Sequence, residues 1–210
     1  MNITERAAEP VYTSDRPAIG TYEEALAHIG RTSRRYVAEV AVSEGSVKMF
    51  CAMIQDPNPA YWDREVANRV FGGPVAPPAL VQGTVLPLPW KPTADQPQSL
   101  AVFAIPLPGR TLINVSTEAV HHRPFFVGET LSCYDEVVEI SPERTTRLGT
   151  GHFITTVFHC VDEAEEPIAS ITNVMFRSFA ITEPDAGTNT FKIRTTAIKQ
   201  DDGTYLLLSI

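Results

Sequence analysis

The stretch "IQDPNPAYWDREVANRVFGGPVAPPAL", from Ile54 to Leu80, decides how this chain folds. Pro57 and Pro59 disfavour α conformation in the residues before them, so a helix arriving from the N-terminal side must end near Asp56. The stretch leads into "PALVQGTVL" (78–86), whose residues are almost all apolar or small. Such a composition predicts a helix that is buried on every side.

The residues before this stretch predict two helices and one strand. "TYEEALAHIG" (21–30) has Thr21 and Glu24 at capping-box spacing and ends on a glycine, which is typical of a short helix. "RRYVAEVAV" (34–42) is rich in valine and partly alternating, and predicts a strand. Ser43 is then placed to cap an amphipathic helix, because the apolar residues that follow it recur at helical spacing.

Asp63 is expected to cap a further short helix that ends at Gly72-Gly73. After the buried helix, residues 87–108 contain six prolines and predict a long irregular connection. The chain then becomes β-like. The strand candidates are 110–122, 129–140, 145–161 and 167–179, the last three joined by the polar turns "SPER" and "DEAEE" into an antiparallel meander.

This order of elements predicts an α+β fold in which a curved antiparallel sheet of about five strands wraps around one central apolar helix. That arrangement is the hot-dog fold, and we expect it to occupy residues 19–180 as a single domain. Residues 1–18 are expected to form an N-terminal arm. Residues 181–210 are expected to form a linker and a C-terminal β-hairpin that turns at Asp202-Gly203.

Charge and composition exclude several classes of function. The formal net charge is −8 and no cluster of Lys and Arg stands out, which argues against a nucleic-acid or anionic-membrane surface. No apolar run reaches the roughly 18 residues that cross a bilayer, and the N-terminus lacks the apolar core of a signal peptide. We therefore expect a soluble cytoplasmic protein.

Neither the cysteines nor the histidines are spaced as metal ligands. Cys51, Cys133 and Cys160 each lie in an apolar or alternating segment, so we expect buried, reduced thiols. His152 and His159 are seven residues apart on one predicted strand and should face opposite sides. The expectation is that the protein holds no metal and no cofactor of its own.

Three segments resemble one known family. "DPNPAYWDREVANRVFGGPVAPPAL" is similar to the motif of MaoC-type (R)-specific enoyl-CoA hydratases, and looks closer still to their FAS1-like branch, the N-terminal MaoC dehydratases. "HHRPFFVGETLSCYDEVVEI" and "GHFITTVFHCVDEAEEPIASITNVMFRSF" resemble the strands of the same family. The resemblance spans roughly residues 34–179 and implies the hot-dog fold predicted above.

The resemblance implies a catalytic pattern Asp-x-Asn-Pro-x-His, which maps onto Asp56, Asn58 and Tyr61. In the family the Asp and the His hold a water molecule between them. Tyr61 stands where the His is expected, and a phenol with a pKa of about 10 is a poor base at neutral pH. It retains the ability to donate a proton or to orient water.

A second catalytic element of the family, an Ala-His-Gly turn that opens the central helix, is replaced here by Ala-Pro-Pro. Proline has no N–H group, so the usual donor to the thioester oxygen is absent at Pro78, and the N–H of Ala79 replaces it only if the turn shifts. The candidate substrate-contacting residues are Gly73, Pro77, Pro78, Ala79 and Gln82.

The same residues also have ordinary structural explanations. Asp56 and Asn58 are typical turn formers that bond to the backbone, and Tyr61 and Trp62 are typical core aromatics. The cations Lys48, Arg64, Arg69 and Lys91 are either solvated or placed to meet phosphates of coenzyme A.

The function implied by the resemblance is hydration of a 2-enoyl thioester, or the reverse, by a subunit with an altered site that depends on a second hot-dog chain. The alternatives are a self-sufficient homodimeric hydratase using Asp56 and Tyr61, and a non-catalytic acyl-thioester binding module. A thioesterase is a weaker alternative, since Gln82 is the nearest polar candidate on the central helix. The acyl group is expected on coenzyme A or an acyl carrier protein, and the assembly to be a homodimer or heterodimer.

Overall fold

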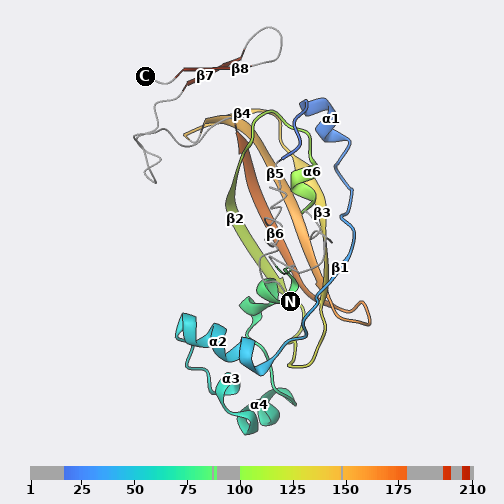
Figure 1. Cartoon of the computed structure of the whole chain (residues 1–210), viewed down its shortest axis with the longest axis vertical. Helices are drawn as coiled ribbons and strands as arrows, with labels where there is room; N and C mark the ends of the chain where they lie inside the picture. Colours follow the sequence, from blue (N-terminus) through green and yellow to red (C-terminus); the bar gives the residue numbers. More distant parts are fainter. Residues whose placement is uncertain are drawn as a thin grey trace, which may run out of the picture.

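The computed structural model describes residues 17–86, 88, 100–147, 149–178, 196–199 and 205–208. Its main feature is a six-stranded antiparallel sheet in the order β1-β3-β5-β6-β2, with the short β4 paired to β5 (Figure 1). The strands are β1 (Tyr36–Val37), β2 (Thr111–His121), β3 (Ser132–Ile140), β4 (Arg144–Thr146), β5 (Gly149–Val161) and β6 (Pro167–Ser178). The predicted α+β hot-dog architecture is confirmed.

The helices are short, and three of them gather at one end of the sheet. They are α1 (Tyr22–Leu26), α2 (Glu44–Ile54), α3 (Pro59–Trp62), α4 (Arg64–Phe71), the 3-10 turn η1 (Pro78–Leu80), α5 (Val81–Val85) and α6 (Ala101–Ala104). Figure 1 shows α2, α3 and α4 together beyond the lower ends of the long strands, with α1 and α6 towards the opposite end. The stretch that follows α4 therefore brings the chain back from this helical block to the sheet.

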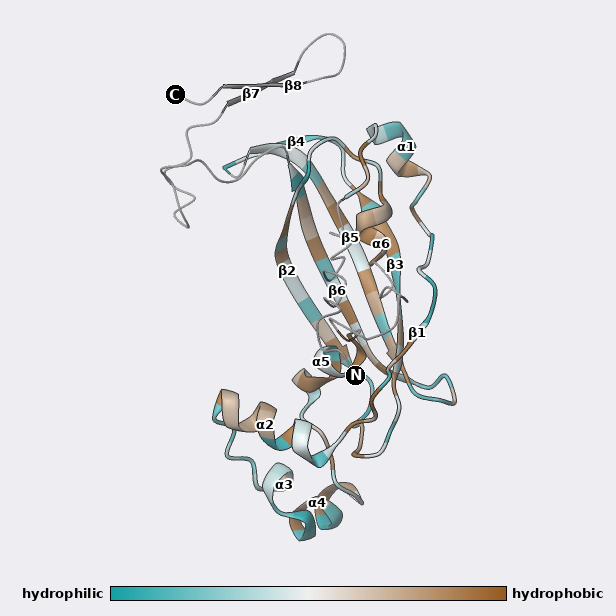
Figure 2. Ribbon diagram, viewed as in Figure 1, coloured by the Kyte–Doolittle hydropathy of each residue, from teal (hydrophilic) through white to brown (hydrophobic). Residues whose placement is uncertain are grey.

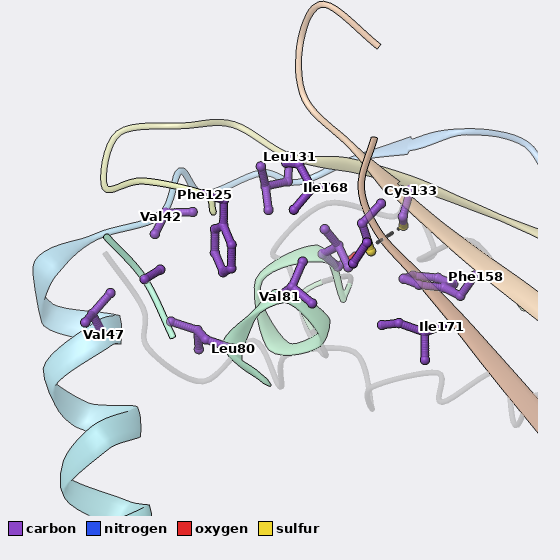
Figure 3. Close-up of a cluster of buried hydrophobic side chains, with 14 of the residues drawn as sticks. Val42, Val47, Leu80, Val81, Phe125, Leu131, Cys133, Phe158, Ile168 and Ile171 are labelled. Atoms are coloured by element: carbon purple, nitrogen blue, oxygen red, sulfur yellow. Dashed lines mark hydrogen bonds between the residues drawn. The ribbon is translucent and has the colours of Figure 1, made fainter. Parts of the chain in front are cut away.

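The main core forms where η1 and α5 pack against the sheet. Leu80, Val81 and Val85 are buried together with Phe125 and Leu131. Figure 3 shows Val81 among these side chains, with Cys133, Phe158 and Ile171 reaching it from the strands. The hydropathy colouring agrees, since apolar residues recur along β3 and β5 and in α5 (Figure 2). The helix is not buried on every side as predicted, because Gln82, Gly83 and Leu86 are exposed; only the face that carries Leu80, Val81 and Val85 packs on the sheet.

The local capping signals are confirmed. Thr21 and Glu24 form a reciprocal capping box at the start of α1. Ser43 caps α2, with the Ser46 hydroxyl completing the box, and Asp63 caps α4 through two backbone N–H groups. The helix before the two prolines ends at Ile54, as their restriction on the preceding residues requires.

Four elements differ from the sequence-based expectation, and one is α6, which lies within residues 87–108 where an irregular connection was predicted. The strand predicted over 34–42 is reduced to β1, because only Tyr36 and Val37 pair with β3 before the chain leaves the sheet. The helix predicted over 78–86 begins as a 3-10 turn and ends at Val85. A four-residue helix that was not predicted, α3, starts directly at Pro59, since proline suits a first helical position.

The turn expected at "SPER" lies instead between Thr146 and Gly149. β4 pairs with the start of β5, so β3 and β4 together form one arm of a longer hairpin. Pro142 interrupts this arm because it has no N–H to donate, and Ser141 bonds to Phe153 through both its backbone N–H and its hydroxyl. The "DEAEE" turn is confirmed between β5 and β6.

The predicted C-terminal hairpin and the predicted N-terminal arm lie largely outside the described part of the chain. A two-stranded antiparallel hairpin, β7 (Thr196–Lys199) and β8 (Tyr205–Leu208), confirms the predicted C-terminal hairpin, while its tip at Asp202-Gly203 lies outside the described residues. The arm predicted over 1–18 is described only for its last two residues. The domain boundaries at 18 and 180 stay predictions.

A buried arginine ties the far end of the sheet to two loops. Arg177 of β6 is fully buried, and its Nε donates to the carbonyl of Gly109 at 2.7 Å. One terminal nitrogen donates to the carbonyl of Ala18 at 2.6 Å and to that of Leu107 at 3.3 Å. Burial lowers the pKa of this guanidinium to about 10. Three carbonyls thus replace the carboxylate partner that a buried arginine usually has.

Gly151 on β5 makes room for the backbone of this arginine, and replacing it should destabilise the sheet. A Cβ at Gly151 would lie 2.0 Å from the carbonyl oxygen of Arg177. We expect Gly151→Ala to lower the free energy of unfolding by about 1–3 kcal/mol in a urea titration, because backbone must move.

Gly45 in α2 is the matched control for this substitution. A Cβ there would meet only the Ser43 hydroxyl, at 3.7 Å. Gly45→Ala should therefore stabilise the protein by up to about 1 kcal/mol through helix propensity. Equal unfolding free energies for the two variants would contradict the steric explanation.

Candidate functional site

Asp56 lies in a tight turn directly after α2. Gln55 closes the helix in the left-handed conformation, with φ 56°, and the Asp56 N–H then donates to the carbonyl of Cys51 at 2.9 Å. The Asp56 Oδ1 accepts the Asn58 N–H at 2.9 Å, and its backbone carbonyl accepts the indole N–H of Trp62 at 2.8 Å. One carboxylate oxygen thus holds the turn, which is the structural role foreseen for Asp56.

Asn58 is the N-cap of α3. Its Oδ1 accepts the Ala60 N–H at 3.1 Å, and Pro59 occupies the first helical position. The amide therefore stabilises the helix that carries Tyr61, in the way that asparagine commonly caps helices. The turn-forming role considered for Asn58 is the one the geometry displays.

Tyr61 is half-buried and packs against the main core cluster. Burial raises the pKa of its phenol, and the nearby Asp56 carboxylate and Cys51 thiol raise it further, against an opposing hydrogen bond with Asn58. The structure therefore brings Asp56, Asn58 and Tyr61 into one electrostatic neighbourhood. At neutral pH the phenol keeps its proton, so Tyr61 is chemically a proton donor here rather than a base.

A hollow of about 460 Å³ opens beside Tyr61, bounded by α2, α3, α4 and the segment that follows α4. Lys48 and Arg64 both line it, and Arg64 lies 3.9 Å from Glu44 across its rim. Two of the cations considered for coenzyme A phosphates thus share one hollow. Asp56 does not line it.

The turn that opens the central helix is held by backbone pairing to the loop before β3. The Ala76 N–H donates to the carbonyl of Phe125 at 2.9 Å, and the Val127 N–H donates to that of Pro74 at 2.9 Å. A Cβ on Gly73 would lie 3.5 Å from the ring of Phe126, so this glycine sits close beside an aromatic side chain. Pro74 and Val75 also line the hollow beside Tyr61.

Pro77 is buried, whereas Pro78, Ala79 and Gln82 are exposed. The first N–H of this segment that makes a helical bond is that of Leu80, to the carbonyl of Pro77 at 2.9 Å. The Ala79 N–H precedes it and is one of the donors that a helix start leaves without an intrahelical partner. Gln82 lies on an exposed face of α5 and does not line the hollow beside Tyr61.

A charged network that was not predicted from the sequence braces this turn. Arg123 bonds to Glu129 at 3.1 Å and to Asp162 at 2.6 Å, and the Phe126 N–H donates to Glu129 at 3.2 Å. Hydrogen bonding to Arg123 lowers the pKa of Asp162. The network holds in place the loop whose residues Phe125 and Val127 form backbone hydrogen bonds with Ala76 and Pro74. The histidine–arginine–proline run at 122–124 carried the only sequence signal for it.

Other groups considered for chemistry occupy structural positions. The three cysteines are free and buried, and burial raises the pKa of Cys133 and of Cys160 to about 12, which makes both thiols poor nucleophiles. His152 is buried against Tyr22, while His159 stacks on Tyr134. Among the described residues, no three His, Cys, Asp or Glu side chains could hold a metal ion, and no helix could cross a membrane.

Residues 27–171, more than half of the chain, match the family model for the FAS1-like dehydratase domain region. The chain belongs to this dehydratase family. A probable enoyl-CoA hydratase alpha subunit from Thermomonospora curvata is 28% identical over 159 residues, covering 71% of this chain and 49% of that protein. The chain thus spans about half the length of this curated relative.

Solved structures agree on the hot-dog fold. The ChsH1-ChsH2 complex from Mycobacterium tuberculosis contains a chain that is 24% identical, with a TM-score of 0.63 covering 77% of this chain and 93% of that one. A MaoC-like dehydratase from Rhodospirillum rubrum is 20% identical, with a TM-score of 0.50 covering 72% of this chain and 94% of that one. At these identities the likeness establishes the fold.

The phenol of Tyr61 should ionise at a higher pH than free tyrosine. We expect the difference in phenolate absorbance between the wild-type protein and Tyr61→Phe to emerge above pH of about 10. Folding raises the pKa of the Tyr61 phenol. The stability linked to the protonated phenol is therefore fully present at a pH below the pKa of Tyr61 in the unfolded chain. It is lost as the pH rises through the pKa of Tyr61 in the folded protein.

The same titration in concentrated urea is the control, since unfolding removes the burial of Tyr61 and the influence of Asp56. The difference signal should then move down to the ordinary tyrosine range. A native-state signal at or below that range would contradict the burial that the structure gives to Tyr61.

Proposed function

We propose that this chain is a subunit of an enoyl-thioester hydratase or dehydratase that adds water to, or removes it from, a 2-enoyl thioester. The proposal is supported by the family match over residues 27–171, within which Asp56 and Tyr61 lie five residues apart and the Asp56 carboxylate acts electrostatically on the Tyr61 phenol. The substrate is carried on coenzyme A or an acyl carrier protein, and the chemistry needs no further cofactor.

Hydration requires a base, a proton donor and a donor to the thioester oxygen. The Asp56 carboxylate takes a proton from water, and the hydroxide oxygen bonds to C3 of the enoyl group. The C2–C3 π electrons then move towards the thioester carbonyl. A protonated Tyr61 supplies the proton that C2 receives, Asp56 then releases its proton to solvent while the Tyr61 phenolate takes one up, and dehydration is the reverse sequence.

The oxyanion donor is the weakest part of the site. Pro78 has no N–H, and the exposed Ala79 N–H is the first donor that this turn offers. A site with a phenol in place of imidazole and a displaced oxyanion donor is an impaired one. We therefore propose that full activity depends on a second hot-dog subunit that completes the site.

The outer edge of β2 is the proposed contact with that subunit. β2 pairs with β6 along ten register positions, and among the described residues no strand pairs with its other edge. Val115 and Val120 are about half exposed on it. An unpaired edge strand of this length is a ready template for another strand, and pairing two sheets edge to edge removes the exposed backbone groups.

The proposal predicts that Asp56→Asn removes hydration of a 2-enoyl-CoA, measured as loss of the ultraviolet absorbance of the conjugated thioester. We expect the rate to fall by roughly 10²- to 10⁴-fold, as for loss of a general base. Tyr61→Phe should lower it within the same range. Glu65→Gln is the matched control, because Glu65 is exposed on α4 and does not line the hollow beside Tyr61.

The assay is made on the chain alone and on the chain co-expressed with a second hot-dog hydratase chain. Activity only in the co-expressed pair supports a dependent subunit, and activity of the chain alone supports the self-sufficient homodimer. An active assembly that Asp56→Asn leaves unchanged would exclude this site. Saturable acyl-CoA binding without turnover in either sample would favour the non-catalytic binding module.

The β2 edge makes a separate prediction about assembly. Lysine at both Val115 and Val120 should convert a dimer, detected by light scattering, into a monomer, because two unpaired charges would be buried at the contact. Val138→Lys, at a similarly exposed valine on β3, is the control and should leave the mass unchanged. A dimer that survives both β2 substitutions would contradict edge pairing through β2.

A further inference from the structure

A groove runs between the central helix (η1 and α5) and the chain segment 36–46, which leads from β1 into α2. It has a volume of about 510 Å³, which lies within the range of small-molecule sites. Val40, Leu86 and Leu88 line it and are 58%, 52% and 39% exposed. Exposed apolar side chains that gather along a groove mark a binding surface.

The polar side chains that line this groove are bonded within the chain. The Tyr36 hydroxyl donates to Glu39 Oε1 at 3.1 Å, and the Ser43 and Ser46 hydroxyls form the capping box of α2. The Thr84 hydroxyl donates to a carbonyl one helical turn earlier, at 3.0 Å. Among the described residues that line the groove, Glu39 is the one that carries a charge, and it is exposed. What the groove offers a ligand is therefore chiefly apolar contact area.

Gly83, in the middle of α5, lines the same groove. A Cβ at this position would meet only Leu80 Cδ1, at 3.9 Å, which is an ordinary van der Waals contact. Packing thus leaves room for alanine, and alanine is more stable than glycine in a helix interior. The missing side chain does not serve the packing of the helix, and its effect is to keep the groove open.

The groove begins beside the turn that carries the candidate substrate contacts. Leu80 lines it and directly follows Ala79, and Figure 3 shows Leu80 on the side of α5 towards Val47 of α2. From Leu80 to Leu86 the helix advances roughly 9 Å at 1.5 Å per residue. An acyl chain whose thioester lies at the Pro77–Ala79 turn would extend its alkyl tail along this track.

We infer that this groove binds the alkyl tail of the acyl thioester and that Gly83 is a specificity-determining residue that admits tails of medium length. The inference rests on the proposed function, since it places the thioester at the turn. It adds the substrate class, which is an enoyl thioester with an apolar tail that reaches past Gly83. Gly83 offers no reacting group, so it changes the preference between acyl chains and leaves the chemical step as it is.

The test compares hydration of crotonyl-CoA, whose acyl group ends one methyl beyond the double bond, with hydration of decenoyl-CoA by the assembly of the proposed function. The wild type should have the higher kcat/KM for decenoyl-CoA, because its longer tail leaves water for the groove. Gly83→Leu should lower kcat/KM for decenoyl-CoA by roughly 10- to 200-fold, mainly through KM, as unfavourable bulk in an apolar pocket does. Turnover of crotonyl-CoA should stay unchanged, because its acyl group ends before Gly83.

Gly45→Leu in α2 is the matched control and should leave the preference unchanged. A Cβ at Gly45 would meet only the Ser43 hydroxyl, at 3.7 Å, and Gly45 does not line the groove. Thermal melts show whether each variant is folded, and Gly83→Ala, which should reduce the preference to a smaller extent, decides the outcome if the leucine variant fails to fold.

Two results would overturn the inference alone. One is a wild type that does not prefer decenoyl-CoA, and the other is a preference that the folded Gly83 variants retain in full. Turnover of neither thioester by the wild-type assembly would overturn the proposed function and the inference with it.

Discussion

The burial of α5 in the curve of the sheet is the constraint on which the rest of the structure depends. A five-residue helix is too short to be stable alone, so its conformation is maintained by packing. Val81 and Val85 are almost completely buried, and each such side chain contributes about 1.5–3 kcal/mol through the area it removes from water. The chain must therefore enter the core at Ala76 and leave it at Leu86. That path places the Pro77–Ala79 turn at the surface end of the helix.

The prolines at the start of this helix suit its fold but supply no N–H donor for the proposed chemistry. Pro77 and Pro78 restrict the backbone of the turn and fit the first positions of η1, where a missing N–H costs no helical bond. Under the proposed function, the same prolines leave no N–H at Pro78 that could meet the thioester oxygen. Asp56 shows a similar division, since one carboxylate oxygen holds the turn to Asn58 while the carboxylate lies near Tyr61. The same residues therefore stabilise the turn without completing the oxyanion site that the proposed function needs.

The sequence predicted an element correctly where the interactions that form it join residues close together in the chain. The caps at Thr21, Ser43 and Asp63 were predictable for this reason, and so was the end of α2 before Pro57. The short β1 was not, because its length depends on where the chain departs from β3, nearly a hundred residues later. Within the candidate site, motif spacing put Asp56 and Tyr61 in one short segment, and their catalytic roles stay a prediction. It could not show that Arg123, Glu129 and Asp162 brace the turn, since that network joins three separate segments.

Asp135 shows how such a signal can be visible in a sequence and still be missed. In "SCYDEVVEI" the residues Cys133, Asp135 and Val137 alternate, so the period of two places this carboxylate on the same face as two core residues. A polar side chain on that face needs a hydrogen-bonding partner in the core, because burying a polar group without one is costly. In the structure its Oδ2 accepts the Ala101 N–H at 2.7 Å, so this carboxylate joins β3 to the start of α6. This contact joins residues 34 positions apart in the chain, so no local sequence pattern could show which group a carboxylate on this face would meet.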